Sequence, residues 1–223
     1  MTRVVLATRN AHKVLEVQRI LAEAAFDLEV VGLDDLPRTP GSDPVPEVAE
    51  TGSTFAANAL LKAHAIAAHT GLPAIADDSG LCVDALNGMP GILSARWSGR
   101  HGDDASNLQL VLDQIADIPP ERRGAYFVCA AALATPAGAE RVVEGRLDGT
   151  LVAEPRGTNG FGYDPVFVPD GDRRTTAQLE PAEKDAISHR GRAFRALLPA
   201  VSELVPGRAV QGHQDVPPVT EDR

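Results

Sequence analysis

Residues 74–80 read Ala74-Ile75-Ala76-Asp77-Asp78-Ser79-Gly80, an apolar run that ends in two carboxylates, a hydroxyl and a glycine. The run from Thr54 to His69 predicts a helix, and Gly71-Leu72-Pro73 ends it. The apolar residues therefore predict a buried strand that delivers both aspartates to its C-terminal end, where open α/β sheets bind ligands. Side chains alternate along a strand, so one aspartate should enter a site while the other holds the turn. An ordinary turn built from Asp, Ser and Gly is the alternative.

A second strand, turn and helix stand at the start of the chain. Val4 to Ala7 is a continuous apolar run, as in a strand buried on both faces, and helical spacing follows from Val14 to Leu21. The turn between them reads Thr8-Arg9-Asn10-Ala11-His12-Lys13. Basic residues oppose the dipole at a helix start, so a phosphate chain explains them better than a cap with a solvated Lys13. The pattern is not a Walker loop.

Glu50 precedes the helix predicted over 54–69, where a carboxylate serves either as a cap or as a metal ligand. Within that helix, Asn58 and Lys62 are one turn apart and share a face. His64 and His69 do not have the spacing of a zinc pair. The helix face with Asn58 and Lys62 is therefore the one that can contribute side chains to a site near the aspartates.

The middle of the chain predicts a loop and then an antiparallel pair of strands. Residues 86–102 are rich in Gly, Pro, Ser and Arg, and a loop of this length is either functional or an interface. Ala125 to Ala134 and Arg141 to Arg146 are strand-like, and Pro136-Ala137-Gly138 predicts the turn of a hairpin.

Two further clusters lie in the last third of the chain. Residues 157–165 are rich in glycine, which lets the backbone approach a ligand, and Phe161 offers a face that can stack on a base. A hairpin loop with buried aromatic residues is the alternative. Lys184, His189 and Arg190 form a basic cluster ahead of the last helix. Arg190, and His189 if protonated, can only donate hydrogen bonds, so this cluster suits a hydrogen-bond acceptor on a ligand.

The composition limits the class of partner. The 223 residues carry 21 Lys and Arg against 31 Asp and Glu, a net charge of −10. This charge argues against a nucleic acid polymer as partner but does not exclude a nucleotide. Cys82 and Cys129 lie in apolar runs and are typical of core residues. No segment is apolar enough to span a membrane, and no leader is evident. We expect a cytoplasmic protein with a single domain over residues 1–205 and a disordered tail over 206–223.

Five short motifs occur in order along nearly the whole chain: Thr8-x-Asn10-x-x-Lys13, Ala76-Asp77-Asp78-Ser79-Gly80, Gly88-x-Pro90-Gly91, Phe161-Gly162-Tyr163-Asp164-Pro165 and Lys184-x-x-x-Ser188-His189-Arg190. Each motif alone is weak, but the ordered series resembles the inosine/xanthosine triphosphate pyrophosphatase family. That family removes deaminated purine nucleotides from the precursor pool. The resemblance implies an α/β fold in which an elongated mixed sheet, flanked by helices, forms two lobes with a nucleotide cleft between them.

The resemblance also implies an activity and an assembly. The activity is the Mg²⁺-dependent hydrolysis of ITP, dITP, XTP or dXTP to the nucleoside monophosphate and pyrophosphate. The assembly is a homodimer. By the same resemblance Asp78 is the proton acceptor and a metal ligand. The residues implied to bind substrate are Thr8, Arg9, Asn10, Ala11, His12, Lys13, Ser79, Phe161, Gly162, Tyr163, Asp164, Lys184, His189 and Arg190. Many relatives have Gly where this chain has Arg9, so how closely this turn approaches phosphate stays open.

The chemistry of the residues agrees with this activity. A triphosphate carries about four negative charges near neutral pH, and Mg²⁺ joins protein carboxylates to phosphate oxygens. Asp78, Glu50 and, as a further candidate, Asp77 can supply the protein oxygens. Beside a metal-bound water, Asp78 need only accept a proton that is already acidic. The lysines that can neutralise charge on a leaving pyrophosphate are Lys13, Lys184 and Lys62. We count Lys62 with Asp78 as catalytic.

Two other classes of protein remain open. One is a phosphatase with an aspartyl-phosphate intermediate, although the adjacent Asp77 and Asp78 do not have the usual D-x-D spacing. The other is a non-catalytic nucleotide-binding module, which would bind nucleotide without magnesium-dependent turnover. The carboxylates argue against the second class, and a trapped phosphoenzyme would favour the first.

Overall fold

The computed structural model describes residues 2–22, 28–36 and 44–204. These residues form a seven-stranded sheet with the order β2-β1-β3-β5-β6-β7, and β4 pairs with β3 off this path. The strands are β1 (Thr2–Leu6), β2 (Leu28–Gly32), β3 (Ala74–Val83), β4 (Met89–Pro90), β5 (Gly124–Ala134), β6 (Glu140–Leu151) and β7 (Phe167–Pro169). The helices are α1 (Ala11–Ala22), α2 (Phe55–Thr70), α3 (Asp104–Gln114), α4 (Pro181–Ile187) and α5 (His189–Leu204).

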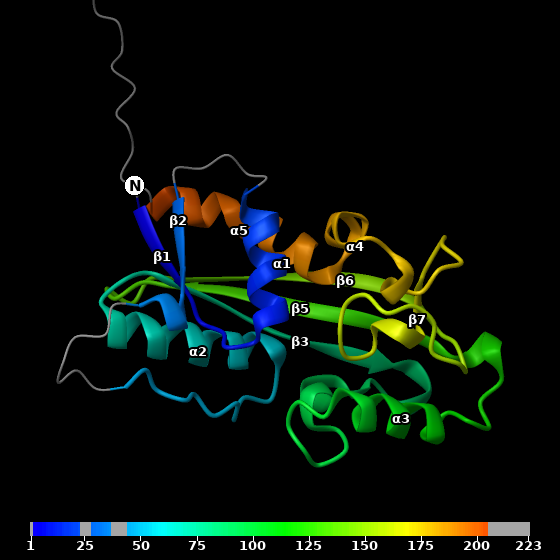
Figure 1. Ribbon diagram of the computed structural model, residues 1–223. Helices are drawn as coiled ribbons and strands as arrows, with labels where there is room; N and C mark the ends of the chain where they lie inside the picture. Colours follow the sequence, from blue (N-terminus) through cyan, green and yellow to red (C-terminus); the bar gives the residue numbers. More distant parts are fainter. Residues whose placement is uncertain (1, 23–27, 37–43, 205–223) are drawn as a thin grey trace, which may run out of the picture.

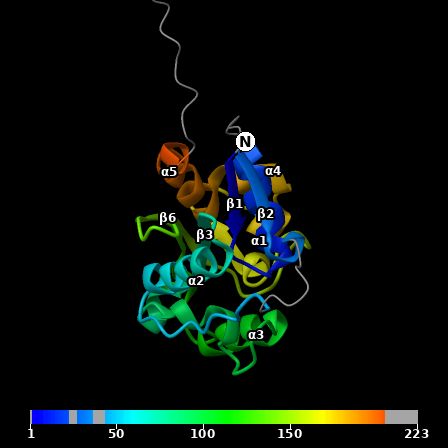
Figure 2. The same ribbon diagram turned by 90° about the vertical axis from the view of Figure 1, so that its left-hand side faces the viewer.

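The helices cover both faces of the sheet. Figure 1 shows α1, α4 and α5 above it and α2 and α3 below it, and the end view in Figure 2 shows the same layers. The predicted α/β class, a mixed sheet flanked by helices, is confirmed. The predicted hairpin is also present, because β5 and β6 pair antiparallel along their lengths. The tail over 206–223 lies outside the described residues.

Strand β3 carries both aspartates, but not at its end. Strand β5 pairs antiparallel with all ten residues of β3, so the hydrogen-bonded ladder continues past Asp78 to Val83. The prediction that the aspartates end the strand is therefore wrong. Parallel pairing with β1 stops at Leu6 and Ile75, two residues before Asp77. The aspartates thus lie just beyond the carboxyl end of β1, which preserves the usual place for a ligand in an open sheet.

Alternation along β3 and β5 separates two cores. Ile75 and Cys129 face α1 and α5 with the larger apolar side chains of those helices. Ala74, Ala76 and Ala130 face α2, whose inward residues are also mostly small. Small side chains on both surfaces let α2 lie close to the sheet. Helix α2 is thereby held directly beneath the aspartates.

A third core lies along the later half of β3. Leu81, Phe127 and Phe167 pack with Val111 of α3. Residues 86–102 are not one extended loop, because they contain β4 and the 3₁₀ helix η3 (Gly91–Arg96). Both cysteines are buried and unbonded, as predicted. No helix among residues 2–22, 28–36 and 44–204 has both the length and the apolar character needed to cross a membrane.

Candidate active site

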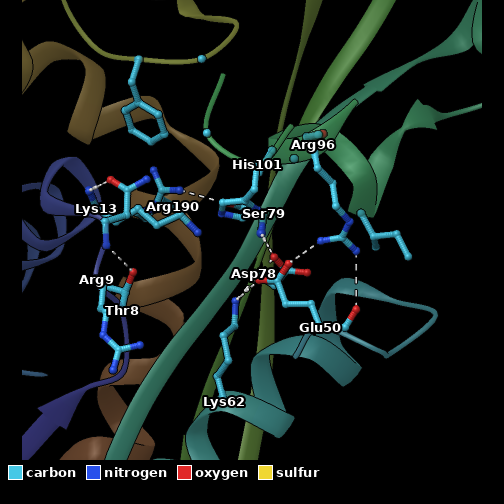
Figure 3. A pocket seen from close by; sticks show the side chains of 18 of the residues that line it. Thr8, Arg9, Lys13, Glu50, Lys62, Asp78, Ser79, Arg96, His101 and Arg190 are labelled. Atoms are coloured by element: carbon cyan, nitrogen blue, oxygen red, sulfur yellow. Dashed lines mark hydrogen bonds and ion pairs between the residues drawn. The ribbon is translucent and has the colours of Figure 1, made fainter. Parts of the chain in front are cut away.

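A cavity of about 770 Å³ opens where the carboxyl end of β1, the middle of β3, α2, η3 and the loop before β7 meet (Figure 3). It collects most of the residues that the sequence singled out. The predicted residues in its wall are Thr8, Arg9, Asn10, Lys13, Glu50, Lys62, Asp78, Ser79, Phe161, Gly162, Tyr163, Asp164, Lys184, His189 and Arg190. Ala11 and His12 belong to the predicted set but are exposed and do not line the cavity.

The two aspartates of β3 face opposite sides, as the alternation predicts. Asp77 points toward α1 and α5, where it meets Lys13 and Arg190. Asp78 points toward α2, where it meets Asn58 and Lys62. Asp78 lines the cavity and Asp77 does not.

Helix α2 supplies the surroundings of Asp78. Asn58 donates from Nδ2 to Asp78 Oδ2 at 3.0 Å, and Lys62 Nζ lies 3.6 Å from Oδ1. Asn58 is itself held, because its Oδ1 accepts from the backbone N–H of Gly52 at 2.8 Å. Burial raises the pKa of Asp78, Lys62 opposes that rise, and the charge on Glu50 adds to it. A carboxyl with a raised pKa is a better proton acceptor than an ordinary aspartate.

Glu50 is not a helix cap, because Thr54 caps α2 by accepting from the backbone N–H of Ala57. Its carboxylate instead lies between two cations, with Lys62 Nζ at 2.9 Å and Arg96 Nη1 at 3.0 Å. Figure 3 shows Lys62 rising from α2 and Arg96 approaching from η3. Burial works to raise the pKa of Glu50, but these cations lower it. Glu50 is therefore an ionised carboxylate in the wall of the cavity.

Arg96 was not identified from the sequence. Its only signal was its place in residues 86–102, which were predicted to be functional without any residue being chosen. The position of Arg96 depends on a long-range contact that the sequence does not reveal. Ser94 Oγ accepts from the backbone N–H of Leu81 at 2.9 Å and so holds η3 against β3. With η3 held there, the Arg96 side chain reaches Glu50.

The turn between β1 and α1 was predicted to be either a phosphate site or a helix cap with a solvated Lys13, and the structure has features of both. Asn10 is a cap, since its Oδ1 accepts from the backbone N–H of His12 at 3.0 Å and of Lys13 at 3.2 Å. Lys13 is not solvated, because its ammonium lies 2.9 Å from Asp77. Arg9 reaches across to donate to the carbonyl of Val45 at 2.9 Å. The first helix therefore presents Lys13 to the cavity on an anchored stem.

A cluster of four buried charges forms the other end of the cavity. Lys184 donates to Asp164 at 2.6 Å and to Glu16 at 2.9 Å, and Glu16 also accepts from Arg190. The ring of Phe161 lies 5.1 Å from Lys184 Nζ and 5.6 Å from Arg190 Cζ. These contacts place Lys184 and Arg190 beside the aromatic face of Phe161.

Glu16 was missed although the sequence carried a sign of it. It follows Lys13 by three residues and precedes Val17 and Ile20 on the inward face of α1, where a charged residue is unusual. Its burial is compensated by the two cations of the cluster, which lower its pKa against the effect of burial. A buried charge on an apolar stripe was the available signal.

The loop that carries Phe161 is fastened on several sides. Asp164 Oδ2 accepts from the backbone N–H of Phe161 at 2.9 Å. The hydroxyl of Tyr163 donates to the carbonyl of Ser94 at 2.9 Å, which joins this loop to η3. The ring of His12 stacks on Phe161 at 5.3 Å. His12 therefore belongs to the outer support of the aromatic face.

His189 is a buried residue of the cavity wall beside two cations. Burial lowers its pKa well below the ordinary value of 6.5, and the charges of Arg190 and Lys184 lower it further. Its ring stacks on Phe127 with centroids 4.7 Å apart. Burial therefore favours the neutral imidazole, in which only one ring nitrogen carries a donor N–H.

Comparison with known proteins places this geometry in a family. Residues 4–200 match the Ham1 family. A dITP/XTP pyrophosphatase of Streptomyces coelicolor is 63% identical over 205 residues, which cover 92% of this chain and 100% of that protein. The solved dITP/XTP pyrophosphatase of Mycobacterium abscessus is 57% identical with a TM-score of 0.69, covering 89% of this chain and 100% of that one. A HAM1 protein from Coxiella burnetii is 40% identical with a TM-score of 0.79, covering 91% and 100%. The chain belongs to the Ham1 family.

Proposed function

We propose that this protein hydrolyses deaminated purine nucleoside triphosphates, ITP, dITP and XTP, to the nucleoside monophosphate and pyrophosphate. The observation that carries the proposal is one cavity with two unlike ends. Carboxylates and lysine lie together at Asp78, Glu50 and Lys62, and an aromatic face with buried cations lies at Phe161 and Arg190. Its volume of about 770 Å³ suits one nucleotide. The relatives that are dITP/XTP pyrophosphatases support the same activity.

The residues divide the chemistry between them. Water attacks the α-phosphorus, the bond to the oxygen that bridges the α- and β-phosphates breaks, and pyrophosphate leaves with the electron pair. Asp78 takes the proton from the water. Lys62 and Lys13 stabilise the negative charge that builds on the pyrophosphate. Asn58 keeps the carboxylate of Asp78 aimed at the cavity.

We further propose that Mg²⁺ is required and that Asp78 and Glu50 hold it. The donor set fits, because both residues offer carboxylate oxygens in the cavity wall. They are also close enough that the charge on Glu50 raises the pKa of Asp78. In the described part of the chain no three ligating side chains gather into a ready metal site. Mg²⁺ commonly uses one or two carboxylates and completes its shell with phosphate oxygens and water. Bound there, it supplies Lewis-acid polarisation of the phosphate.

The decisive experiment measures pyrophosphate release from ITP, dITP, XTP, GTP and ATP by wild type and Asp78→Asn. The substitution keeps the shape and removes the proton acceptor, so turnover should fall by roughly 10²–10³-fold while thermal unfolding stays cooperative. Asp185→Asn is a matched control, since Asp185 is buried against Arg19 at 2.6 Å and is not in the cavity wall. A folded Asp78→Asn enzyme with near wild-type turnover would refute the assignment.

The same panel separates the other classes. A non-catalytic module would bind these nucleotides and release no pyrophosphate. An aspartyl-phosphate mechanism would leave label from γ-³²P or α-³²P nucleotide on the protein after acid quenching. Asp77 is shielded from the cavity, and Asp78 already accepts from Asn58 and Ser79, so no described contact favours a phosphoenzyme.

A homodimer and a cytoplasmic location complete the proposal. The family resemblance implies the homodimer, and the cytoplasmic location is an expectation from the sequence. Light scattering of the purified protein tests the first, with a mass near twice 23.5 kDa as the expected result. Fractionation of cells that carry a tagged chain tests the second.

A further inference from the structure

Asp77 joins three residues of the cavity wall without belonging to that wall. The residue is 1% exposed. Its Oδ2 lies 2.9 Å from Lys13 Nζ, 3.2 Å from Ser79 Oγ and 3.3 Å from Arg190 Nη2. All three partners line the cavity, so Asp77 stands behind the groups that face a ligand.

The partners come from three separate elements. Lys13 belongs to α1, Ser79 to β3 and Arg190 to α5. All of these contacts converge on Oδ2, and Oδ1 has no hydrogen-bond partner among the described residues. Because one oxygen serves all three donors, a shift of one cation changes the position that suits the other.

Two cations meet the buried side chain of Asp77 at contact distance. Lys13 Nζ lies 2.9 Å and Arg190 Nη2 3.3 Å from its Oδ2. Arg190 is 2% exposed and has only Glu16 as a second carboxylate partner among the described contacts. Without Asp77, two cations on different helices would lose their common anchor.

We infer that Asp77 is a positioning residue that sets Lys13 and Arg190 relative to each other, and so links the phosphate end of the cavity to the base end. The inference rests on the proposed function, which assigns phosphate to Lys13 and base to Arg190. Asp77 itself touches no substrate and moves no proton. Its effect passes through the two cations.

The first experiment compares wild type, Asp77→Asn and the control Asp185→Asn. Calorimetry gives the affinities for pyrophosphate and for inosine, and dITP hydrolysis gives kcat and KM. In Asp77→Asn, kcat should fall by roughly 10²-fold because the cations are misplaced. Pyrophosphate should bind as tightly as before or more tightly, because Lys13 no longer has an internal anion. Inosine should bind about fivefold more weakly because Arg190 loses its anchor.

The control separates positioning from stability. Asp185→Asn should lower the unfolding temperature and leave kcat and both affinities unchanged. If Asp77→Asn weakens pyrophosphate and inosine in parallel, or behaves like Asp185→Asn, Asp77 is only structural and the inference is wrong. If wild type hydrolyses no nucleoside triphosphate, the proposed function fails first. The two failures are thus distinguishable.

A second experiment does not depend on the folding of Asp77→Asn. Inosine has no phosphate, so Lys13→Met should alter its affinity only through Asp77, by about fivefold. Arg96→Met, which removes a cation held by Glu50 on the other side of the cavity, should leave inosine affinity unchanged. Unchanged inosine affinity in Lys13→Met would overturn the link between the two ends.

Discussion

His189 shows how burial decides the chemistry of a single side chain. In the unfolded chain an imidazole takes up a proton below about pH 6.5. In the folded chain the buried ring beside Arg190 resists protonation, because its pKa is lowered well below that value. Between these two pKa values the unfolded state binds the extra proton, so stability is lost as the pH falls.

The free energy of unfolding should therefore drop between pH 6.5 and pH 5, by up to about 1.4 kcal/mol per pH unit from this group. His189→Gln removes the titrating group. The free energy of unfolding of this variant should depend less steeply on pH over this interval, whether the variant is more or less stable than wild type. Urea unfolding at several pH values measures this. His69→Gln is the control, because His69 is exposed and should keep the wild-type slope. An unchanged slope in His189→Gln would mean that the ring is already charged when folded.

At the scale of elements, η3 matters because of how closely it lies on β3. A Cβ added at Gly80 would overlap the carbonyl oxygen of Gly91 and the hydroxyl of Ser94. Both groups belong to η3, and Ser94 also satisfies the backbone of Leu81. Glycine at position 80 is thus what lets η3 dock and aim Arg96 at Glu50.

Gly80→Ala should push η3 away, lowering the free energy of unfolding by about 1–3 kcal/mol and reducing dITP turnover together. Gly32→Ala is a matched control in another strand, because its Cβ would meet the movable side chain of Asp35 at 3.0 Å. Thermal unfolding and pyrophosphate release measure the two effects. Wild-type turnover in Gly80→Ala would show that activity does not require the close contact between η3 and β3.

Helix α1 gives a second prediction at this scale. Its anchored N-terminus presents Lys13 to the cavity, so Lys13→Ala should weaken the binding of ITP far more than that of IMP. Only the triphosphate places β- and γ-phosphates near the helix start. Calorimetry in the presence of Mg²⁺ measures the affinities of both ligands. A nonhydrolysable analogue replaces ITP where turnover would interfere. Equal weakening of the two ligands would remove Lys13 from the polyphosphate site.

At the scale of the whole molecule, base selection depends on residues from distant parts of the chain. Within the described contacts, Arg190 of α5 uses four of its five N–H groups on Asp77, Ser79 and Glu16. One N–H remains to donate to an oxygen at position 6 of the purine. Adenine has an amino donor there, so donor would face donor. This contact alone does not exclude guanine, which shares the 6-oxo group.

Wild type should therefore prefer ITP over ATP by roughly 10⁴-fold in kcat/KM, and Arg190→Ala should collapse that ratio. The ratio is the right readout because it does not depend on the fraction of protein that is folded. Arg190→Lys keeps the charge and should retain part of the preference. ATP used as well as ITP by wild type, or a ratio unmoved by Arg190→Ala, would contradict this origin of selectivity. ITP and dITP should be used similarly, because none of the contacts proposed above involves the ribose 2′-hydroxyl.

Local sequence patterns were enough to locate the main secondary-structure elements and most of the residues around the cavity. Apolar runs and helical spacing located β1, α1, α2 and the β5–β6 hairpin, because short-range periodicity follows burial directly. Alternation placed Asp77 and Asp78 on opposite faces. The ordered motifs then brought Asp78, Lys13 and Arg190 into one hypothesis.

How those residues pair their charges depends on long-range contacts of the folded chain. That β3 continues past Asp78 depends on β5, which pairs with it from about fifty residues away. Arg96 and Glu16 act through partners far along the chain, which periodicity cannot identify. His189 is neutral because the assembled core removes water from its ring and places two cations near it. Long-range pairing and burial set these properties, and neither is written in any local stretch of residues.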